Sequence, residues 1–280
     1  MVNDNKNSCC CSKREEVVED VKILEVKKTY DAVAEGKGSF AVGTNKFSPK
    51  GPTNAIINYI LNSNKTNIID IGCGMGTTVL EIVKNYPALN KIIGLDFSQK
   101  MIEKANEERD KLPPELRKKV GFFVVDIQSL PYMDEQFDIA LSECVFNLIP
   151  FPNREKALSE VYRVLADDGA FLYTDFVAHK PIPEKVKNCD LVSGCKTGSI
   201  TALENINLLR KHKFSGIQYV DFTEDKNKRA IELRESSEEI RKDYEEFSKS
   251  YPDIVKFIEE ELYYYLFIAK KELTAAKCCG

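Results

Sequence analysis

The stretch NIIDIGCGMGTT, residues 67–78, decides the fold of this chain. A short apolar run ends in Asp70, glycines follow at 72, 74 and 76, and a helix-forming segment comes next. A strand, a glycine turn and a helix N-terminus in this order let the backbone approach a polar ligand closely. The spacing Gly-x-Gly-x-Gly differs from the Gly-x-Gly-x-x-Gly of dinucleotide-binding proteins. Asp70 would repel a pyrophosphate but not a cationic ligand, so the loop favours a cationic one.

Short apolar strands alternate with amphipathic helices from residue 67 to residue 222. This βα pattern predicts a parallel sheet, and right-handed crossovers place the C-terminal ends of its strands at one edge, where ligands bind. Residues 223–261 interrupt the pattern with charged segments of helical periodicity. They are more often a surface cap than a partner-binding element, although they could help to enclose a substrate.

The composition is that of a globular protein with a sizeable core: 280 residues, 43% apolar and 30% charged. The net charge of −4 argues against a nucleic-acid partner, because phosphate binding needs clustered Lys and Arg. We see neither a signal peptide nor an apolar run long enough to span a bilayer, and we expect a cytoplasmic monomer. Nine cysteines in such a chain point to thiol chemistry or metalloid binding rather than to a disulfide framework.

Four segments resemble, in the correct order, the motifs of the class I S-adenosylmethionine-dependent methyltransferases. Residues 67–78 resemble motif I. The other three are KIIGLDFSQKMIEKA (91–105, second strand), residues 122–149 (third and fourth strands) and residues 155–176 (helix, Gly turn and fifth strand). Four motifs in order make a chance match unlikely, whereas one glycine loop would be weak evidence.

The resemblance implies an α/β fold with a doubly wound, mostly parallel seven-stranded sheet of the Rossmann-like methyltransferase type. We expect a cysteine-containing tail, a helix over about 14–34 and a loop in residues 1–49, a cofactor-binding core in 50–222, and a helical insert, closing strand and Cys-containing tail in 223–280. In the family's pattern the apolar run LYYYLFIAK, residues 262–270, is the seventh strand, antiparallel and at the edge of the sheet.

The resemblance also implies the cofactor S-adenosyl-L-methionine and a set of residues that hold it. Asp70 would accept from its amino group, and Asp96, about twenty residues past the last glycine, would hold the ribose hydroxyls. Asp126 would contact the adenine. The remaining expected cofactor residues are Gly72, Cys73, Gly74, Gly76, Phe97, Met101, Ile127 and Glu143. Core packing is the alternative for Met101 and Ile127. Asn147 and Asp175 stand at strand ends where the substrate could be met.

Two cysteines narrow the range of possible substrates. Cys144 follows the fourth predicted strand and Cys195 lies in a loop beyond the fifth, so both are expected at the catalytic edge. Either alone could be a small buried apolar residue. Together they suit a soft metal or metalloid, and trivalent arsenic bound by thiolates keeps a lone pair that can attack a methyl group without a general base. SECVFNLIP (142–150), SGCKTG (193–198) and the N-terminal CCCS (9–12) resemble segments of the arsenite methyltransferases.

In terms of that family, Cys144 and Cys195 would bind arsenic, and one or two of Cys9, Cys10 and Cys11 would assist catalysis as auxiliary thiols. Many members carry another ligand cysteine before motif I, but residues 36–66 contain none here. A third thiol would then come from the N-terminal cluster or from a small thiol, and a reductant of the glutathione or thioredoxin type would be the co-substrate. The role of Cys189 is ambiguous. Cys278 and Cys279 either take part in redox or metal exchange or belong to a C-terminal tail without function.

We therefore expect a methyltransferase that acts on arsenite or its thiol conjugate in arsenic detoxification. The first alternative is a small-molecule C- or O-methyltransferase of the quinone or sterol type, which would depend on a carboxylate or His base. The chain has only two histidines, His179 and His212, neither in a recognisable base motif. The second alternative is a thiol-based metalloid-binding protein without catalytic activity.

Overall fold

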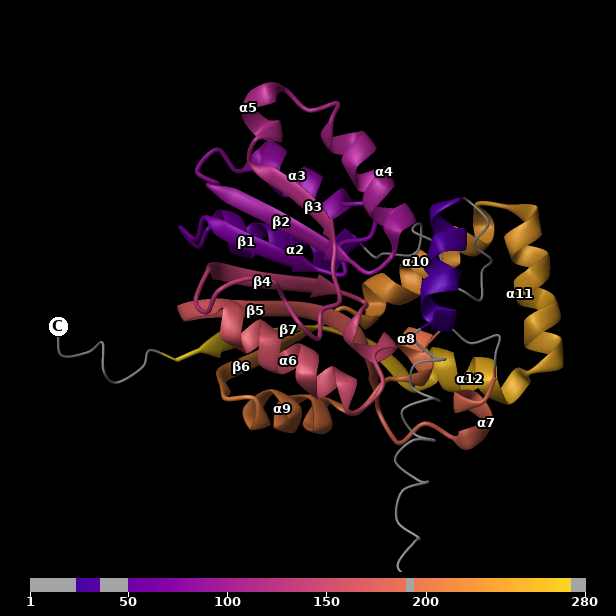
Figure 1. The fold of residues 1–280 in the computed structure, drawn as a ribbon. Coiled ribbons are helices and arrows are strands. Elements are labelled where there is room, and N and C mark those ends of the chain that lie inside the picture. The colour runs from indigo at the N-terminus through magenta and orange to yellow at the C-terminus, as the bar shows by residue number, and fades with distance from the viewer. Residues whose placement is uncertain (1–23, 36–49, 190–193, 273–280) are drawn as a thin grey trace, which may run out of the picture.

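The computed structural model describes residues 24–35, 50–189 and 194–272, and its centre is one seven-stranded sheet (Figure 1). The strand order is β3-β2-β1-β4-β5-β7-β6. The first five strands in that order are parallel, and β7 is antiparallel to both of its neighbours. The strands are β1 (Asn67–Ile71), β2 (Lys91–Asp96), β3 (Val120–Val124), β4 (Phe137–Glu143), β5 (Leu165–Ala178), β6 (Phe214–Asp221) and β7 (Leu262–Lys271). The expected fold class is confirmed.

Helices cover both faces of the sheet. The helices are α2 (Lys50–Leu61), α3 (Thr77–Asn85), α4 (Gln99–Arg109), α5 (Pro114–Arg117), α6 (Asn153–Val164), α7 (Glu184–Lys187), α8 (Gly194–Thr197), α9 (Ala202–Lys211), α10 (Thr223–Glu235), α11 (Glu238–Ser250) and α12 (Pro252–Glu260), with the short 3-10 helix η2 (Phe146–Leu148) between β4 and α6. Residues 24–34 are also helical. They belong to the helix expected over about 14–34, whose first part lies outside the described residues. No helix in the described ranges is long and apolar enough to cross a bilayer.

Alternation along the strands builds two cores. Ile68 and Ile92 face α2, α3 and α4, whereas Ile69 and Ile93 face α6 and α9. Because successive side chains of a strand point to opposite faces, the apolar runs of β1 and β2 supply both cores at once. The parallel strands are therefore buried on both sides, which fixes their C-terminal ends in one row.

A third core lies at the C-terminal edge of the parallel strands. It joins Phe176 of β5 and Tyr264 of β7 to apolar side chains of α7 and α12, and it includes Cys195, with Cys144 packed against it. In Figure 1 the helix 24–34 and the insert α10, α11 and α12 also lie on this side of the molecule, beyond the strand ends. The charged insert thus stands next to the edge at which ligands bind in this kind of fold.

The expectation that residues 262–270 form the edge strand is wrong. β7 lies between β5 and β6, and β6 is at the edge. The physical reason is burial: most residues of β7 are buried, whereas the second half of β6 is exposed, with Tyr219 50% accessible. A strand that is apolar on both faces gains more from an internal position than a strand that alternates with polar residues.

Candidate active site

A cavity of about 930 Å³ opens at the C-terminal edge of the sheet, and residues far apart in the sequence line it. Twelve of the residues singled out from the sequence are on its wall: Asp70, Gly72, Cys73, Gly74, Asp96, Phe97, Met101, Asp126, Ile127, Glu143, Cys144 and Cys195. The parallel strands deliver them there because each predicted motif ends at the same edge. Gly76, Asn147 and Asp175 are not on this wall.

The glycine loop turns tightly over the end of β1. Gly72 has a positive φ of 77°, and a Cβ at this position would lie 2.3 Å from Cγ2 of Val145. The amide N–H groups of Gly72 and Cys73 donate to the carbonyl of Leu95 at 2.7 and 2.8 Å, which ties the loop to β2. Gly72 is therefore required by both its backbone conformation and the space available.

Gly76 has a packing role rather than a place on the cavity wall. It is the N-cap of α3, also with φ of 77°, and a Cβ there would lie 2.4 Å from Cζ of Phe122. The expectation that this glycine contacts the cofactor through the loop has no support in the geometry, because Phe122 and Ala105 fill the adjacent space.

Three carboxyl groups give the cavity an acidic end: Asp70 and Asp96 are buried and Glu143 is half-buried. Burial raises the pKa of Asp70 well above its usual range, and the nearby charges of Glu143 and Asp96 raise it further. Within the described residues the carboxylate of Asp70 makes no hydrogen bond, although the side chain is only 3% exposed. A buried anion without a partner is costly, so this end of the cavity suits a ligand that brings positive charge.

The other two carboxylates are already held by the protein. Glu143 accepts from the hydroxyls of Thr53 at 2.6 Å and Thr78 at 2.7 Å. Asp96 accepts from the backbone N–H groups of Gly74 and Ser98, both at 2.9 Å. Burial raises the pKa of each, while these hydrogen bonds oppose the rise. These carboxylates, as hydrogen-bond acceptors and negative charges, fit the amino and sulfonium groups and the ribose hydroxyls of S-adenosylmethionine.

Cys144 and Cys195 lie together on the wall of the same cavity. The two side chains belong to the same apolar cluster, and the nearness of Cys195, together with burial, raises the pKa of the Cys144 thiol. Cys144 follows β4 with a positive φ of 60°, a conformation that is uncommon for a residue other than glycine. Cys195 is in the short helix α8 and is 8% exposed. The fold thus joins two sulfurs that are about fifty residues apart in the chain.

A buried polar network holds the segment of Cys195 against the segment of Cys144. The Nδ2 amide of Asn147 donates to the carbonyls of Phe176 at 2.7 Å and Cys195 at 3.0 Å. The guanidinium of Arg154 bridges the carbonyls of Asn147 at 3.2 Å and Gly198 at 3.0 Å. Asn147 and its neighbour Asp175 therefore support the cysteine pair from behind, rather than meeting the substrate as their positions in the sequence indicated.

Other residues from the sequence prediction do not join the site. Cys9, Cys10, Cys11, Cys278 and Cys279 lie outside the described residues. Cys189 packs against the third core. Among residues 24–35, 50–189 and 194–272, no three His, Cys, Asp or Glu side chains are grouped as a metal site would require. His179 bonds to the hydroxyl of Tyr263 and His212 to that of Ser159, both at 3.0 Å, and neither histidine is on the cavity wall.

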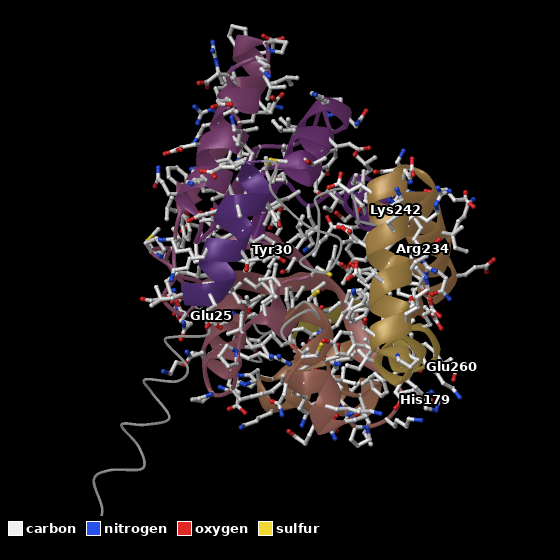
Figure 2. All side chains as sticks on the ribbon, turned by 90° about the vertical axis from the view of Figure 1, so that its right-hand side faces the viewer. Glu25, Tyr30, His179, Arg234, Lys242 and Glu260 are labelled. Atoms are coloured by element: carbon white, nitrogen blue, oxygen red, sulfur yellow. The ribbon has the colours of Figure 1, made fainter. Side chains whose placement is uncertain are left out.

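Several wall residues escaped the sequence analysis, above all Tyr30, Lys196 and Tyr264. Tyr30 comes from the helix 24–34, which stands opposite the insert helices that carry Arg234 and Lys242 (Figure 2). Burial and then the charges of Cys195 and Cys144 raise the pKa of Tyr30, so this phenol is close to the pair. Burial lowers the pKa of Lys196 and the two cysteines oppose that change. Only the helical spacing of Tyr30 and the adjacency of Lys196 to Cys195 hint at these places.

A family model described as a methyltransferase domain matches residues 62–214. The chain belongs to this methyltransferase domain family. Together with the strand order and the motif order, the match makes it a class I S-adenosylmethionine-dependent methyltransferase by family. The matched region includes the glycine loop, the three carboxylates and both cysteines of the pair.

Curated relatives of this methyltransferase include two substrate classes. An arsenite methyltransferase of Halobacterium salinarum is 29% identical over 152 residues, which are 54% of this chain and 38% of that protein. A demethylmenaquinone methyltransferase of Lactobacillus johnsonii is 36% identical over 103 residues, 36% of this chain and 40% of that protein. The chain thus matches less than half the length of each of these relatives.

Solved structures agree on the fold. Phosphoethanolamine N-methyltransferase 2 of Haemonchus contortus, in complex with S-adenosyl-L-methionine, superposes with a TM-score of 0.65 at 22% identity and covers 88% of this chain and 57% of that one. The [4+2]-cyclase SpnF superposes with a TM-score of 0.60 at 21% identity, covering 79% and 81%. At such identities the likeness concerns the architecture alone.

Proposed function

We propose that this protein transfers a methyl group from S-adenosylmethionine to trivalent arsenic held by the thiolates of Cys144 and Cys195. The observation that carries the proposal is that these two cysteines lie close together on the wall of the cavity that also contains the glycine loop and Asp70. Soft thiolates select soft metals and metalloids, so a pair of them at the methyl-donor site favours such a substrate.

The main task of the protein in this reaction is to hold the arsenic and the methyl group in line. The lone pair of arsenic attacks the methyl carbon, the bond from that carbon to sulfur breaks with its electrons going to the sulfur, and S-adenosylhomocysteine leaves. Arsenic goes from the trivalent to the pentavalent state, and a thiol reductant of the glutathione or thioredoxin type then returns it to the trivalent state. Holding both reactants in line gives effective molarities of about 10⁵ M or more.

On this proposal some cofactor residues bind through charge and hydrogen bonds, and others form the apolar walls of the pocket. Asp70 faces the cationic amino acid part, Asp96 the ribose and Asp126 the adenine, with Phe97, Met101 and Ile127 as apolar walls. We further propose that the enzyme works as a monomer in the cytoplasm, since a reducing compartment keeps its nine cysteines as thiols. Cys10 and Cys11 would then serve as auxiliary thiols.

The deciding experiment supplies the purified chain with methyl-labelled S-adenosylmethionine, arsenite and a thiol reductant, and identifies the labelled product by chromatography with arsenic-specific mass detection. We expect methylated arsenic. Cys144→Ser and Cys195→Ser should each lower its formation about 100-fold or more, because one sulfur cannot hold the metalloid, while the affinity for S-adenosylmethionine stays within about twofold.

Cys189→Ser is the matched control, since this thiol belongs to the same apolar cluster but is not on the cavity wall. Its activity should stay within about twofold of the unchanged protein. In a parallel assay with a quinol or phenol in place of arsenite, transfer of the label to that compound at equal rates in all three serine variants would instead support the small-molecule alternative that the menaquinone relative represents. Arsenic binding without formation of S-adenosylhomocysteine would leave only a binding protein.

A further inference from the structure

Tyr264 of β7 brings a hydroxyl group to the sulfur of Cys144. The phenol Oη donates to Sγ of Cys144 at 3.5 Å and lies 3.0 Å from Oγ1 of Thr174. The side chain of Tyr264 is 1% exposed, yet it reaches the cavity wall. A buried phenol normally needs a partner, and here one of its two partners is a thiol of the cysteine pair.

These contacts close a ring of three residues: Cys144 directly after β4, Thr174 of β5 and Tyr264 of β7. The backbone N–H of Cys144 donates to the carbonyl of Thr174 at 2.8 Å, and the hydroxyl of Thr174 meets the phenol that reaches back to the Cys144 sulfur. Thr174 therefore holds Cys144 by its main chain and, through Tyr264, by its sulfur. Both the backbone and the side chain of Cys144 are fixed from the same two strands.

Tyr264 is itself rigid. Its backbone N–H donates to the hydroxyl of Thr223 at 3.1 Å, and its carbonyl accepts from the N–H of Phe222 at 2.8 Å. The ring of Phe176 packs edge-on against the phenol ring, with centroids 5.2 Å apart at 77°. The hydroxyl can therefore move little, so its hydrogen bond holds the Cys144 sulfur at one place.

A cysteine side chain has three staggered rotamers, which place the sulfur in three different directions, and a hydrogen bond to the sulfur favours the rotamer that can make it. We propose that Tyr264 is a positioning residue that selects the rotamer in which the Cys144 sulfur lies beside the Cys195 sulfur on the cavity wall. Its importance for arsenic methylation rests on the proposed function, whereas its effect on the distance between the two sulfurs does not.

The test compares Tyr264→Phe with the unchanged full-length protein by means of dibromobimane, which bridges two thiols only when they are close, and monobromobimane, which labels single thiols. Peptide mass mapping identifies the Cys144–Cys195 bridge separately from the other cysteines. Removing the hydroxyl should lower the rate of bridging, relative to single labelling of Cys144, by about three- to tenfold, as expected for one lost buried hydrogen bond.

Tyr263→Phe is the matched control. It removes a phenol from the same strand that bonds to His179 instead of to the cysteine pair, so the bridging ratio should stay within about 1.5-fold. In the arsenite assay Tyr264→Phe should raise the KM for arsenite severalfold and leave the KM for S-adenosylmethionine unchanged, a split that general loosening of the fold would not give.

An unchanged bridging ratio in Tyr264→Phe would overturn the positioning role, even if arsenic methylation were demonstrated. A lowered bridging ratio without any arsenite-dependent activity would keep the positioning role and refute the arsenic substrate. Should Tyr264→Phe fail to bind S-adenosylmethionine, Thr174→Val opens the same ring while it keeps the backbone carbonyl, and it must lower the ratio in the same direction.

Discussion

At the scale of single residues, Asp175, which helps to hold the cysteine pair, makes the stability of the protein depend on pH. Its carboxylate accepts the N–H groups of Asn147 at 2.9 Å and Phe176 at 3.0 Å. Burial above all, and then the charge of Cys195, raises the pKa of Asp175 to about 8. The folded protein therefore binds a proton that the unfolded chain, with an Asp pKa of about 3.9, releases at a lower pH.

The stability of the protein should accordingly fall as the pH rises from about 4 to about 8, and the contribution of Asp175 should level off above that range. One proton gives a slope of at most about 1.4 kcal/mol per pH unit in the free energy of unfolding. Asp175→Asn removes this slope, so the loss of stability between pH 5 and pH 8 should be smaller in the variant. Denaturant titrations at pH 5, 6.5 and 8 measure it, and equal losses in the two proteins would refute the shift.

The sequence identified the residues of motif I and both thiols of the pair, because strand ends and glycine spacing can be read along the chain. It did not identify Tyr264. The run of three tyrosines in LYYYLFIAK alternates between the two sheet faces, and which face each one takes depends on pairing with β5, a long-range contact. Asn147 lies in η2, just past β4, and Asp175 lies inside β5 near its end, and only the three-dimensional structure shows that both are behind the site.

At the scale of elements, the helix 24–34 places Tyr30 on the cavity wall and is anchored to α4. The hydroxyl of Ser98, which caps α4, donates to Oδ1 of Asp31 at 2.5 Å, and Glu35 pairs with Lys100. The Glu35 pair is exposed, so it adds little to the anchoring. The partly buried contact of Asp31 is the stronger link between this helix and the cofactor side of the fold.

Asp31→Ala should therefore weaken binding of S-adenosylmethionine by about five- to tenfold, since about 1 kcal/mol of hydrogen bonding no longer holds the helix over the cavity. Glu25→Ala, an exposed change on the same helix (Figure 2), should leave the affinity unchanged. Isothermal titration of both variants measures the effect. Equal affinities would mean that the helix does not contribute to the cofactor site.

Element prediction succeeded where periodicity was strong and failed where position in the sheet mattered. The βα alternation over residues 67–222 predicted the parallel strands. The order of β6 and β7 depends instead on which of the two strands is more apolar. FSGIQYVD is interrupted by the polar residues Ser215, Gln218 and Asp221, whereas LYYYLFIAK is apolar at nearly all positions. That contrast in burial assigns the edge to β6 and the interior to β7.

At the scale of the whole molecule, the acidic end of the cavity links ligand binding to stability. A ligand that binds only the folded state at about 100 times its Kd stabilises that state by about 2.7 kcal/mol. For a chain of this size S-adenosylmethionine should then raise Tm by about 5–10 °C. Asp70→Asn relieves charge repulsion among the three carboxylates, so the ligand-free Tm should rise while the shift on adding S-adenosylmethionine shrinks.

Differential scanning fluorimetry with increasing S-adenosylmethionine checks both signs in one experiment. A variant whose ligand-induced shift equals that of the unchanged protein would show that Asp70 does not meet the cationic part of the ligand. The division of the chain at residues 49 and 222 stays a prediction. Expression of residues 50–222 alone would test it, and because this fragment lacks β7, the strand between β5 and β6, its β5 and β6 would have no partner between them.

The place of β7 also bears on biosynthesis. A ribosome delivers β5 and β6 first, and in the described sheet neither pairs with the other, so a nascent chain halted at residue 261 has a gap where β7 belongs. At that moment the glycine loop is complete, but Cys144 has no phenol beside it. Residues up to 261 already include the glycine loop and both cysteines of the pair, so the contact that only β7 can add is the hydroxyl of Tyr264 on the Cys144 sulfur.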